Sequence, residues 1–208
     1  MRASDVAYEA VRERILDLTL APGAIVNEQG LARELDLGRM PVREALARLV
    51  GDQLVEVLPR RGAVVAPLNL DRVVAIFDAR EAVECGIAHV VAPKATAEQL
   101  DQLRRLVEAT ETAKEGTDVE TFLQHDCTIH HYLLEMMGNH LLDAVGERLL
   151  QHNLRLWRSF FVTSPAAADT MISHLPLLAA LEAHDGPAAD EAMREHLNAA
   201  RQLLKSTF

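Results

Sequence analysis

The chain has 208 residues, of which 49% are hydrophobic and only 4% aromatic, and it carries a net charge of −10. This length allows one large domain or two small ones, and an apolar, aromatic-poor composition favours packed helices over a β-sandwich. The sequence has no apolar run of the roughly 18–20 residues that span a membrane and no basic-then-apolar leader. Its two cysteines, Cys85 and Cys127, are too few for a disulfide framework. We therefore expect a cytoplasmic protein with no membrane partner.

Helical periodicity predicts three short helices in the first third of the chain. The first runs from a cap at Ser4 or Asp5 to about Leu18, the second begins after a cap at Asn27, and the third ends near Gly51. Two β-rich runs, 54–58 and 63–66, flank a Pro/Gly turn and predict a hairpin. Three helices followed by such a hairpin indicate a winged helix-turn-helix domain over residues 1–67.

The ten residues 37–46 (Leu-Gly-Arg-Met-Pro-Val-Arg-Glu-Ala-Leu) are typical of the turn and recognition helix of a DNA-binding helix-turn-helix. Pro41 sets φ for a first helical turn, and Arg39 and Arg43 project from that turn. The major groove of DNA accepts polar side chains at the start of such a helix. This stretch therefore indicates DNA binding in a chain whose overall charge argues against it.

Charge is distributed unevenly along the chain. Residues 1–66 carry nine Arg and ten Asp or Glu, a net charge of −1, whereas residues 67–208 carry a net charge of −9. Arginine suits phosphates and guanine edges, and Arg60 and Arg61 at the expected hairpin tip are placed to touch the DNA backbone or minor groove. The acidic remainder would be repelled by DNA and must face away from it.

Amphipathic helices follow one another after Pro67, with breaks at Pro, Gly and Asn. Six are expected, at about 70–92, 96–115, 118–137, 139–163, 166–185 and 187–206. Such a series predicts an antiparallel six-helix bundle over residues 68–208. The expected fold class is therefore mainly α, with a winged helix-turn-helix ahead of the bundle.

Four side chains of the second segment could hold a metal ion. Asp126 and His130 are spaced i, i+4 and share one helix face, while His174 and His196 lie on the fifth and sixth expected helices. If three helices point these groups at one place, three imidazoles and one carboxylate form a site for a divalent ion such as Zn, Ni, Mn or Fe. Coordination positions left open could take water or a carboxylate.

Less specific interpretations of the same residues stay open. An isolated Asp-x-x-x-His is often a surface pair, and a single His on an apolar face is often a hydrogen-bonded core residue. A bound ion with an open position could also activate water in a metal-dependent helical-bundle enzyme, although no persuasive general base accompanies the site; Glu81 and Glu84 are more simply helix-face charges. The ion itself could instead be the signal, in a direct metal sensor, or the bundle could serve only for dimerisation.

The chain resembles a GntR-family transcription regulator with a FadR-type C-terminal ligand (FCD) domain, of the VanR-like six-helix subgroup. The resemblance covers essentially the whole length. In the N-terminal part it rests on Leu18–Gly23, Leu31–Leu35, Arg39–Leu46, Leu49 and Pro59–Gly62. In the C-terminal part it rests on Ala79–Glu84, Asp126, His130, Gly138, Asn139, His174, Asp185, Ala188–Ala192 and Met193–Leu197.

The resemblance implies roles for individual residues of the N-terminal domain. Arg39 and Arg43 match positions that contact operator bases and phosphates, and Gly62 matches the wing-tip glycine. Gln29 stands where the family often has an arginine, with Arg33 one turn away, and Met40 replaces a small hydroxyl residue, so these two contacts differ from the family pattern. The expected DNA-contacting set is Arg33, Arg39, Arg43, Arg60, Arg61 and Gly62.

The resemblance also implies a sensor in the second domain. All four metal positions are filled (Asp126, His130, His174 and His196), and Arg80 matches an arginine that often lines the effector cavity; Arg155 is a further candidate for binding the effector. The implied protein is not an enzyme. It is a homodimeric regulator, expected to be a repressor, which binds a palindromic double-stranded operator and responds to a small organic or sugar acid at the metal.

Overall fold

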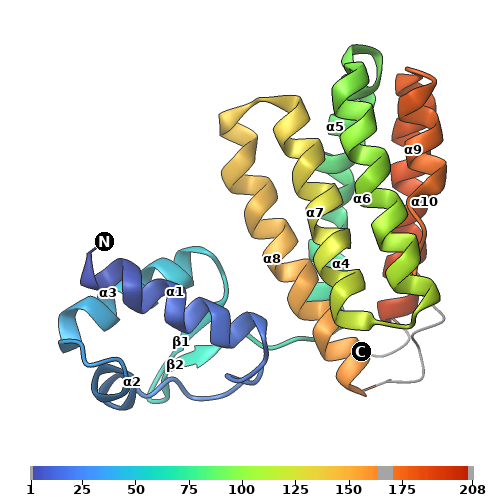
Figure 1. The fold of residues 1–208 in the computed structure, drawn as a ribbon. Helices are drawn as coiled ribbons and strands as arrows, with labels where there is room; N and C mark the ends of the chain where they lie inside the picture. Colours follow the sequence, from blue (N-terminus) through green and yellow to red (C-terminus); the bar gives the residue numbers. More distant parts are fainter. Residues whose placement is uncertain (1, 164–170, 206–208) are drawn as a thin grey trace. The chain divides into compact units, whose positions relative to one another are not determined.

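The computed structural model describes residues 2–163 and 171–205, which form two compact units, residues 1–68 and residues 69–208 (Figure 1). Each unit is described by itself below; the first is called the head and the second the bundle. The fold is mainly α with one small hairpin, as the sequence predicts. No helix in the described ranges has the length and apolar character needed to cross a membrane.

Three helices build most of the head: α1 (Ala3–Leu16), α2 (Glu28–Glu34) and α3 (Arg39–Gly51). The prediction that Ser4 or Asp5 caps α1 is wrong, because the helix begins earlier. Its N-cap is Arg2, whose backbone N–H donates to the Asp5 carboxylate at 3.2 Å. The cap at Asn27 is confirmed, since its side chain accepts a hydrogen bond from the Gly30 backbone at 3.0 Å.

The predicted hairpin is present as β1 (Val55–Leu58) and β2 (Gly62–Val65), which pair antiparallel with Val55 opposite Val65. The turn between them needs a left-handed backbone at two positions, φ 65° at Arg60 and φ 76° at Gly62, and glycine adopts this conformation without strain. An isolated bridge joins Ile25 to Val64, so the segment after α1 lies along the outer edge of β2.

The head has its own hydrophobic core, in which α1 packs against α3. Val11, Ile15, Val42 and Leu49 are fully buried, at the helical spacings that the sequence predicts. Because the apolar faces of the helices are used in this core, the polar face of α3 remains outside. The core thus leaves the arginines of α3 on the surface of the head.

The bundle begins with α4 (Leu70–Arg80), which continues through a π-helical segment (Glu81–Cys85) into α5 (Gly86–Val91) and a short 3₁₀ turn (Ala92–Lys94). The remaining helices are α6 (Ala97–Glu115), α7 (Val119–Met137), α8 (His140–Thr163), α9 (Leu175–Glu182) and α10 (Gly186–Lys205). The elements from Leu70 to Lys94 follow one another without a break and form one helical rod. With this rod counted as one helix, the described residues contain the six helices that the sequence predicts.

One bundle helix differs from its prediction. The fifth was expected over 166–185, but α9 begins only at Leu175, and the part of the prediction over 166–170 lies outside the described residues. Pro176 stands in the first turn of α9, where its missing N–H costs nothing. His174 is therefore the residue just before the helix and not a residue within it, which corrects the expectation that three helices supply the metal-site residues.

Two glycines leave room for close approaches between bundle helices. A Cβ added to Gly146 of α8 would lie 2.4 Å from the Leu134 side chain of α7, and one added to Gly186 would lie 2.6 Å from the His89 carbonyl oxygen. Both glycines therefore allow an approach that a larger residue would prevent. Cys85 is buried and Cys127 partly buried, and both thiols are free.

Candidate metal centre and DNA-contacting arginines

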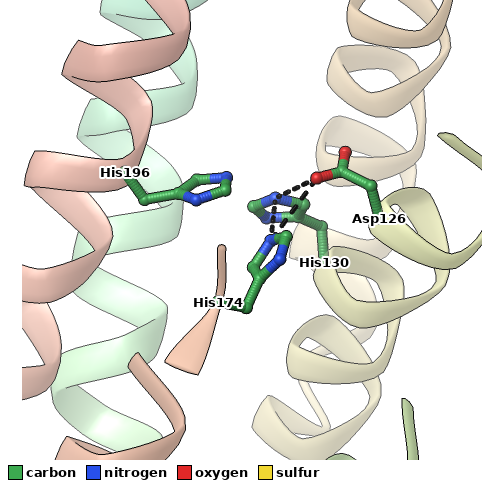
Figure 2. Close-up of side chains that lie close together, drawn as sticks. All are labelled: Asp126, His130, His174 and His196. Carbon is green, nitrogen blue, oxygen red and sulfur yellow. Dashed lines mark hydrogen bonds and ion pairs between the residues drawn. The ribbon is translucent and has the colours of Figure 1, made fainter. Parts of the chain in front are cut away.

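The four predicted metal-site residues come together inside the bundle (Figure 2). Asp126 and His130 project from α7, His196 projects from α10, and His174 enters from the residue before α9. All four are buried, and one potential donor atom of each lies within 4.8 Å of the other three. The convergence that the sequence could only suggest is therefore a property of the fold.

The spacing of the donor atoms fits a single bound ion. The Nε2 atom of His174 lies 3.3 Å from Nε2 of His130 and 3.4 Å from Oδ1 of Asp126, and the latter two atoms are 3.8 Å apart. Metal bonds of about 2.0–2.2 Å place two ligands of one ion roughly 3.0–4.4 Å apart. Three imidazoles and one carboxylate also form the mixed N/O donor set that divalent transition metals accept.

The electrostatics of the cluster keep two of its imidazoles neutral. Burial lowers the pKa of His196 to about 3, and burial together with the neighbouring His196 and His130 holds the pKa of His174 well below its usual value. Burial raises the pKa of Asp126, against the opposing effect of His130. A neutral imidazole has a lone pair that a cation could use, and a cation there would also stabilise the Asp126 carboxylate.

Glu84, whose sequence pattern is simply that of a helix-face charge, is a buried carboxylate in contact with this cluster. It accepts hydrogen bonds from Arg80, from Nε at 2.6 Å and from Nη2 at 3.1 Å, and its Oε2 lies 2.7 Å from Nδ1 of His130. Burial alone would raise the pKa of Glu84, but Arg80 and His130 hold it well below its ordinary value. The i, i+4 spacing of Arg80 and Glu84 was the available signal for the pair.

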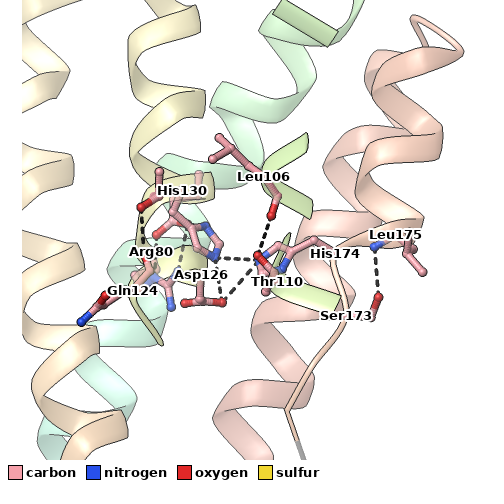
Figure 3. Close-up of polar contacts among 11 residues, drawn as sticks. Arg80, Leu106, Thr110, Gln124, Asp126, His130, Ser173, His174 and Leu175 are labelled. Atoms are coloured by element: carbon pink, nitrogen blue, oxygen red, sulfur yellow. Dashed lines mark hydrogen bonds and ion pairs between the residues drawn. The ribbon is translucent and has the colours of Figure 1, made fainter. Parts of the chain in front are cut away.

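The two predicted effector-binding arginines, Arg80 of α4 and Arg155 of α8, are both fully buried. Figure 3 shows Arg80 beside Asp126, His130 and His174, so its positive charge lies next to the candidate metal centre. Its guanidinium already forms an ion pair with Glu84, so Arg80 is not an unpaired cation. Arg158, on the same helix as Arg155, pairs instead with Glu120 on the surface at 2.6 Å.

One side of the cluster borders a cavity. His196, the most exposed of the four at 8%, lines a hollow of about 170 Å³ together with Ser173, Leu177 and Glu195. This volume accommodates a solute of a few heavy atoms. The cavity gives such a solute access to the His196 side of the cluster.

The predicted DNA-contacting residues lie on the surface of the head. Arg39 and Arg43 are exposed in the first turns of α3, and Arg60, Arg61 and Gly62 are exposed at the tip of the hairpin. Arg33, near the end of α2, is also exposed and donates to the Gln29 carbonyl oxygen at 3.4 Å. Arg43 pairs with Glu28 at 3.0 Å, a contact between exposed groups that a phosphate or base could replace at small cost.

Comparisons with known families divide the chain at the same place as the fold. Residues 3–65 match the family model described as bacterial regulatory proteins, gntR family, and residues 75–199 match the model of the FCD domain. The first range covers the three helices and hairpin of the head. The second covers all four residues of the candidate metal centre.

Similar proteins match over nearly the whole chain. The HTH-type transcriptional repressor RspR of Escherichia coli (strain K12) is 29% identical over 191 residues, covering 91% of this chain and 83% of the relative. An HTH-type transcriptional regulator in an unstable DNA locus of Streptomyces ambofaciens is 31% identical over 196 residues, covering 92% and 80%. The solved structure of E. coli McbR/YncC has the same fold, with a TM-score of 0.82, 20% identity and coverage of 100% and 99%.

Proposed function

Because this chain belongs to the GntR family of DNA-binding transcription regulators and carries an FCD domain, we propose that it is a repressor whose DNA binding is controlled by a small carboxylate held at a metal ion. Its membership makes it a regulator and not an enzyme. The observation that carries the sensing half of the proposal is the convergence of Asp126, His130, His174 and His196.

The head would read DNA through its exposed arginines. Arg39 and Arg43 start the helix that enters the major groove, and Arg60 and Arg61 flank the backbone from the hairpin tip, where Gly62 permits close approach. A homodimer related by a two-fold axis would place two such helices on the halves of a palindromic operator. Repression is supported by the name of the relative RspR, and location in the cytoplasm agrees with a role on DNA.

The bundle would act as the sensor. Asp126, His130, His174 and His196 would hold a divalent ion, with zinc, nickel, manganese and iron as the candidates. When bound, the ion supplies positive charge and open coordination positions that attract a carboxylate. Arg80 and Arg155 would complete the recognition of an organic or sugar acid, with Arg80 sharing its guanidinium between the acid and Glu84.

Selection of bound duplexes from a random DNA library tests the DNA-binding half of the proposal. An inverted repeat should be enriched, and the complex should contain two chains of 22.9 kDa each. Enrichment of a single unrepeated half-site, or a complex with one chain, would contradict the palindrome and the homodimer.

Calorimetry of a panel of small organic and sugar acids against metal-loaded protein tests the sensing half. We expect an acid that binds the wild type to lose affinity for the His174→Ala variant. The matched control is His131→Ala, which removes a half-exposed histidine of α7 that pairs with Glu135 and Glu147 outside the cluster. Equal affinity of the acid for wild type and His174→Ala would reject binding through the metal.

The same samples distinguish a direct metal sensor from a carboxylate sensor. A direct sensor would change its DNA affinity when the metal alone is added or removed. The proposed regulator would keep its DNA affinity until an acid is added to the metal-loaded protein.

A further inference from the structure

The buried carboxylate of Glu84 contacts both Arg80 and the candidate metal ligand His130. We infer that Glu84 is a positioning residue that orients His130 toward the ion. The inference rests on the proposed metal centre and adds a residue to it. Glu84 lies in the π-helical segment between α4 and α5, and only 6% of it is exposed. A charged group is rarely buried to this extent unless it is paired.

The geometry assigns each oxygen of Glu84 a partner. Oε1 accepts from Arg80 Nε at 2.6 Å, while Oε2 lies 3.1 Å from Arg80 Nη2 and 2.7 Å from His130 Nδ1. Arg80 thus fixes the carboxylate from one side, and the carboxylate faces the imidazole from the other. The Oε2–Nδ1 contact is a close ion-pair distance without hydrogen-bond geometry, so Glu84 acts on His130 through its proximity and its charge.

The contact with Glu84 decides which nitrogen of His130 is available to a metal. A carboxylate at Nδ1 favours the tautomer with the proton on Nδ1, which leaves the lone pair on Nε2. Nε2 is the atom that faces His174 at 3.3 Å and Asp126 at 3.8 Å. Glu84 therefore prepares His130 to bind an ion at the point where the other donors converge.

Glu84 also neutralises the charge of Arg80. Arg80 is 1% exposed and lies among the residues of the cluster, where an unpaired guanidinium would repel a divalent cation. The ion pair removes that repulsion. One carboxylate thus performs two tasks at the candidate site, and removal of its charge should weaken metal binding through both.

The first test is a titration of metal-free protein with Co²⁺, followed by calorimetry and by the visible absorption of the bound ion. We expect Glu84→Gln to bind Co²⁺ about 10–100-fold more weakly than the wild type, with a changed absorption spectrum. Glu81→Gln is the matched control, because Glu81 lies in the same π-helical segment but pairs with Arg194 of α10. It should bind Co²⁺ as the wild type does.

A double variant guards against misfolding of Glu84→Gln, in which Arg80 would be buried without its partner. Arg80→Met combined with Glu84→Gln removes both charges at once, a change that folded proteins tolerate better than the loss of one partner. If Glu84 positions His130, the double variant stays at least about tenfold weaker for Co²⁺. Wild-type affinity in either variant would overturn the inference.

The second test needs no metal. Nitrogen chemical shifts of the imidazoles, with His130 identified by its absence in His130→Gln, report which ring nitrogen carries the proton. The wild type should show His130 protonated at Nδ1, and the double variant should show a mixture of tautomers. If the wild type binds no Co²⁺ but shows this tautomer, the proposed metal centre is rejected and the positioning role of Glu84 remains. If the tautomer is unchanged in the double variant, the positioning role alone is overturned.

Discussion

Arginine serves opposite purposes in the two units of this protein. The five predicted DNA-contacting arginines of the head are exposed, whereas Arg80 and Arg155 of the bundle are fully buried. An exposed arginine costs little to keep and is available to a phosphate, but a buried one must be paired, which makes it part of the structure. The comparison predicts that head arginines affect binding and that buried bundle arginines affect folding.

The largest effect should come from breaking the buried pair. Arg80→Ala leaves the Glu84 carboxylate buried without its main partner and should destabilise the bundle by about 3–5 kcal/mol. Urea unfolding followed by the fluorescence of Trp157, which lies in α8, measures this loss. A shift below about 1 kcal/mol, the size expected of an exposed pair, would contradict the buried role.

Removal of metal should come next and should also act on the bundle alone. An ion present at 100 times its dissociation constant stabilises the folded state by about 2.7 kcal/mol. Treatment with a chelator should therefore speed hydrogen exchange in peptides of α7 and α10 and leave those of α3 unchanged. Equal protection of the bundle before and after treatment would argue against a bound ion.

Arg43→Ala should weaken specific operator binding by about 1–3 kcal/mol, because it removes one base or phosphate contact. Since the side chain is exposed, the unfolding of the variant should match that of the wild type. Gel shifts at fixed salt measure the affinity, and Arg48→Ala, which removes another arginine of α3 that pairs with Asp5, is a control for lost charge. Unchanged operator affinity would remove Arg43 from the contacts.

The buried histidines predict a gradual loss of stability in mild acid. Because the folded-state pKa of His196 is lowered to about 3, the unfolded chain takes up protons below about pH 6.5 while the folded bundle does not. Metal-free protein should therefore be fully stable above pH 6.5 and lose stability as the pH falls toward 3. Urea midpoints between pH 7.5 and 5 measure the slope, which His196→Gln should reduce; a flat profile would contradict the shift.

The smallest effect is expected from an exposed arginine of the bundle. Arg104 pairs with Glu182 at 2.7 Å, but both side chains are more than a third exposed. Its replacement by Ala should leave the urea midpoint nearly unchanged, as for an arginine of the head. A loss of stability comparable to that of Arg80→Ala would show that the contribution of an arginine to stability depends on its domain and not on its burial.

The elements of the head were predictable because their signals are local. The cap at Asn27, the turn before Arg39 and the glycine at the hairpin tip each act within a few residues of their own position. Where local signals compete, the prediction failed: Ser4 and Asp5 are both good caps, yet α1 starts before them because Asp5 turns back to the Arg2 backbone.

The candidate site in the bundle was predictable only in part. The spacing of Asp126 and His130 and the resemblance to a family gave the four donors, but neither gave Glu84, whose role depends on a helix far away in sequence. A carboxylate on a helix face and one facing a buried imidazole have the same local pattern. Only the packing of the rod from Leu70 to Lys94 against α7, made chiefly by α5, tells them apart.

His174 stands at the entrance to α9 and not within it, and its Nε2 atom lies beside that of His130, 44 residues earlier in the chain. An ion bound to both would cross-link residues 130 and 174 in the folded bundle, and would stabilise it by binding the folded state and not, as a disulfide does, by restricting the unfolded chain. Unlike a covalent bridge, such a cross-link opens when the metal leaves. Metal supply would then set how long the bundle stays folded.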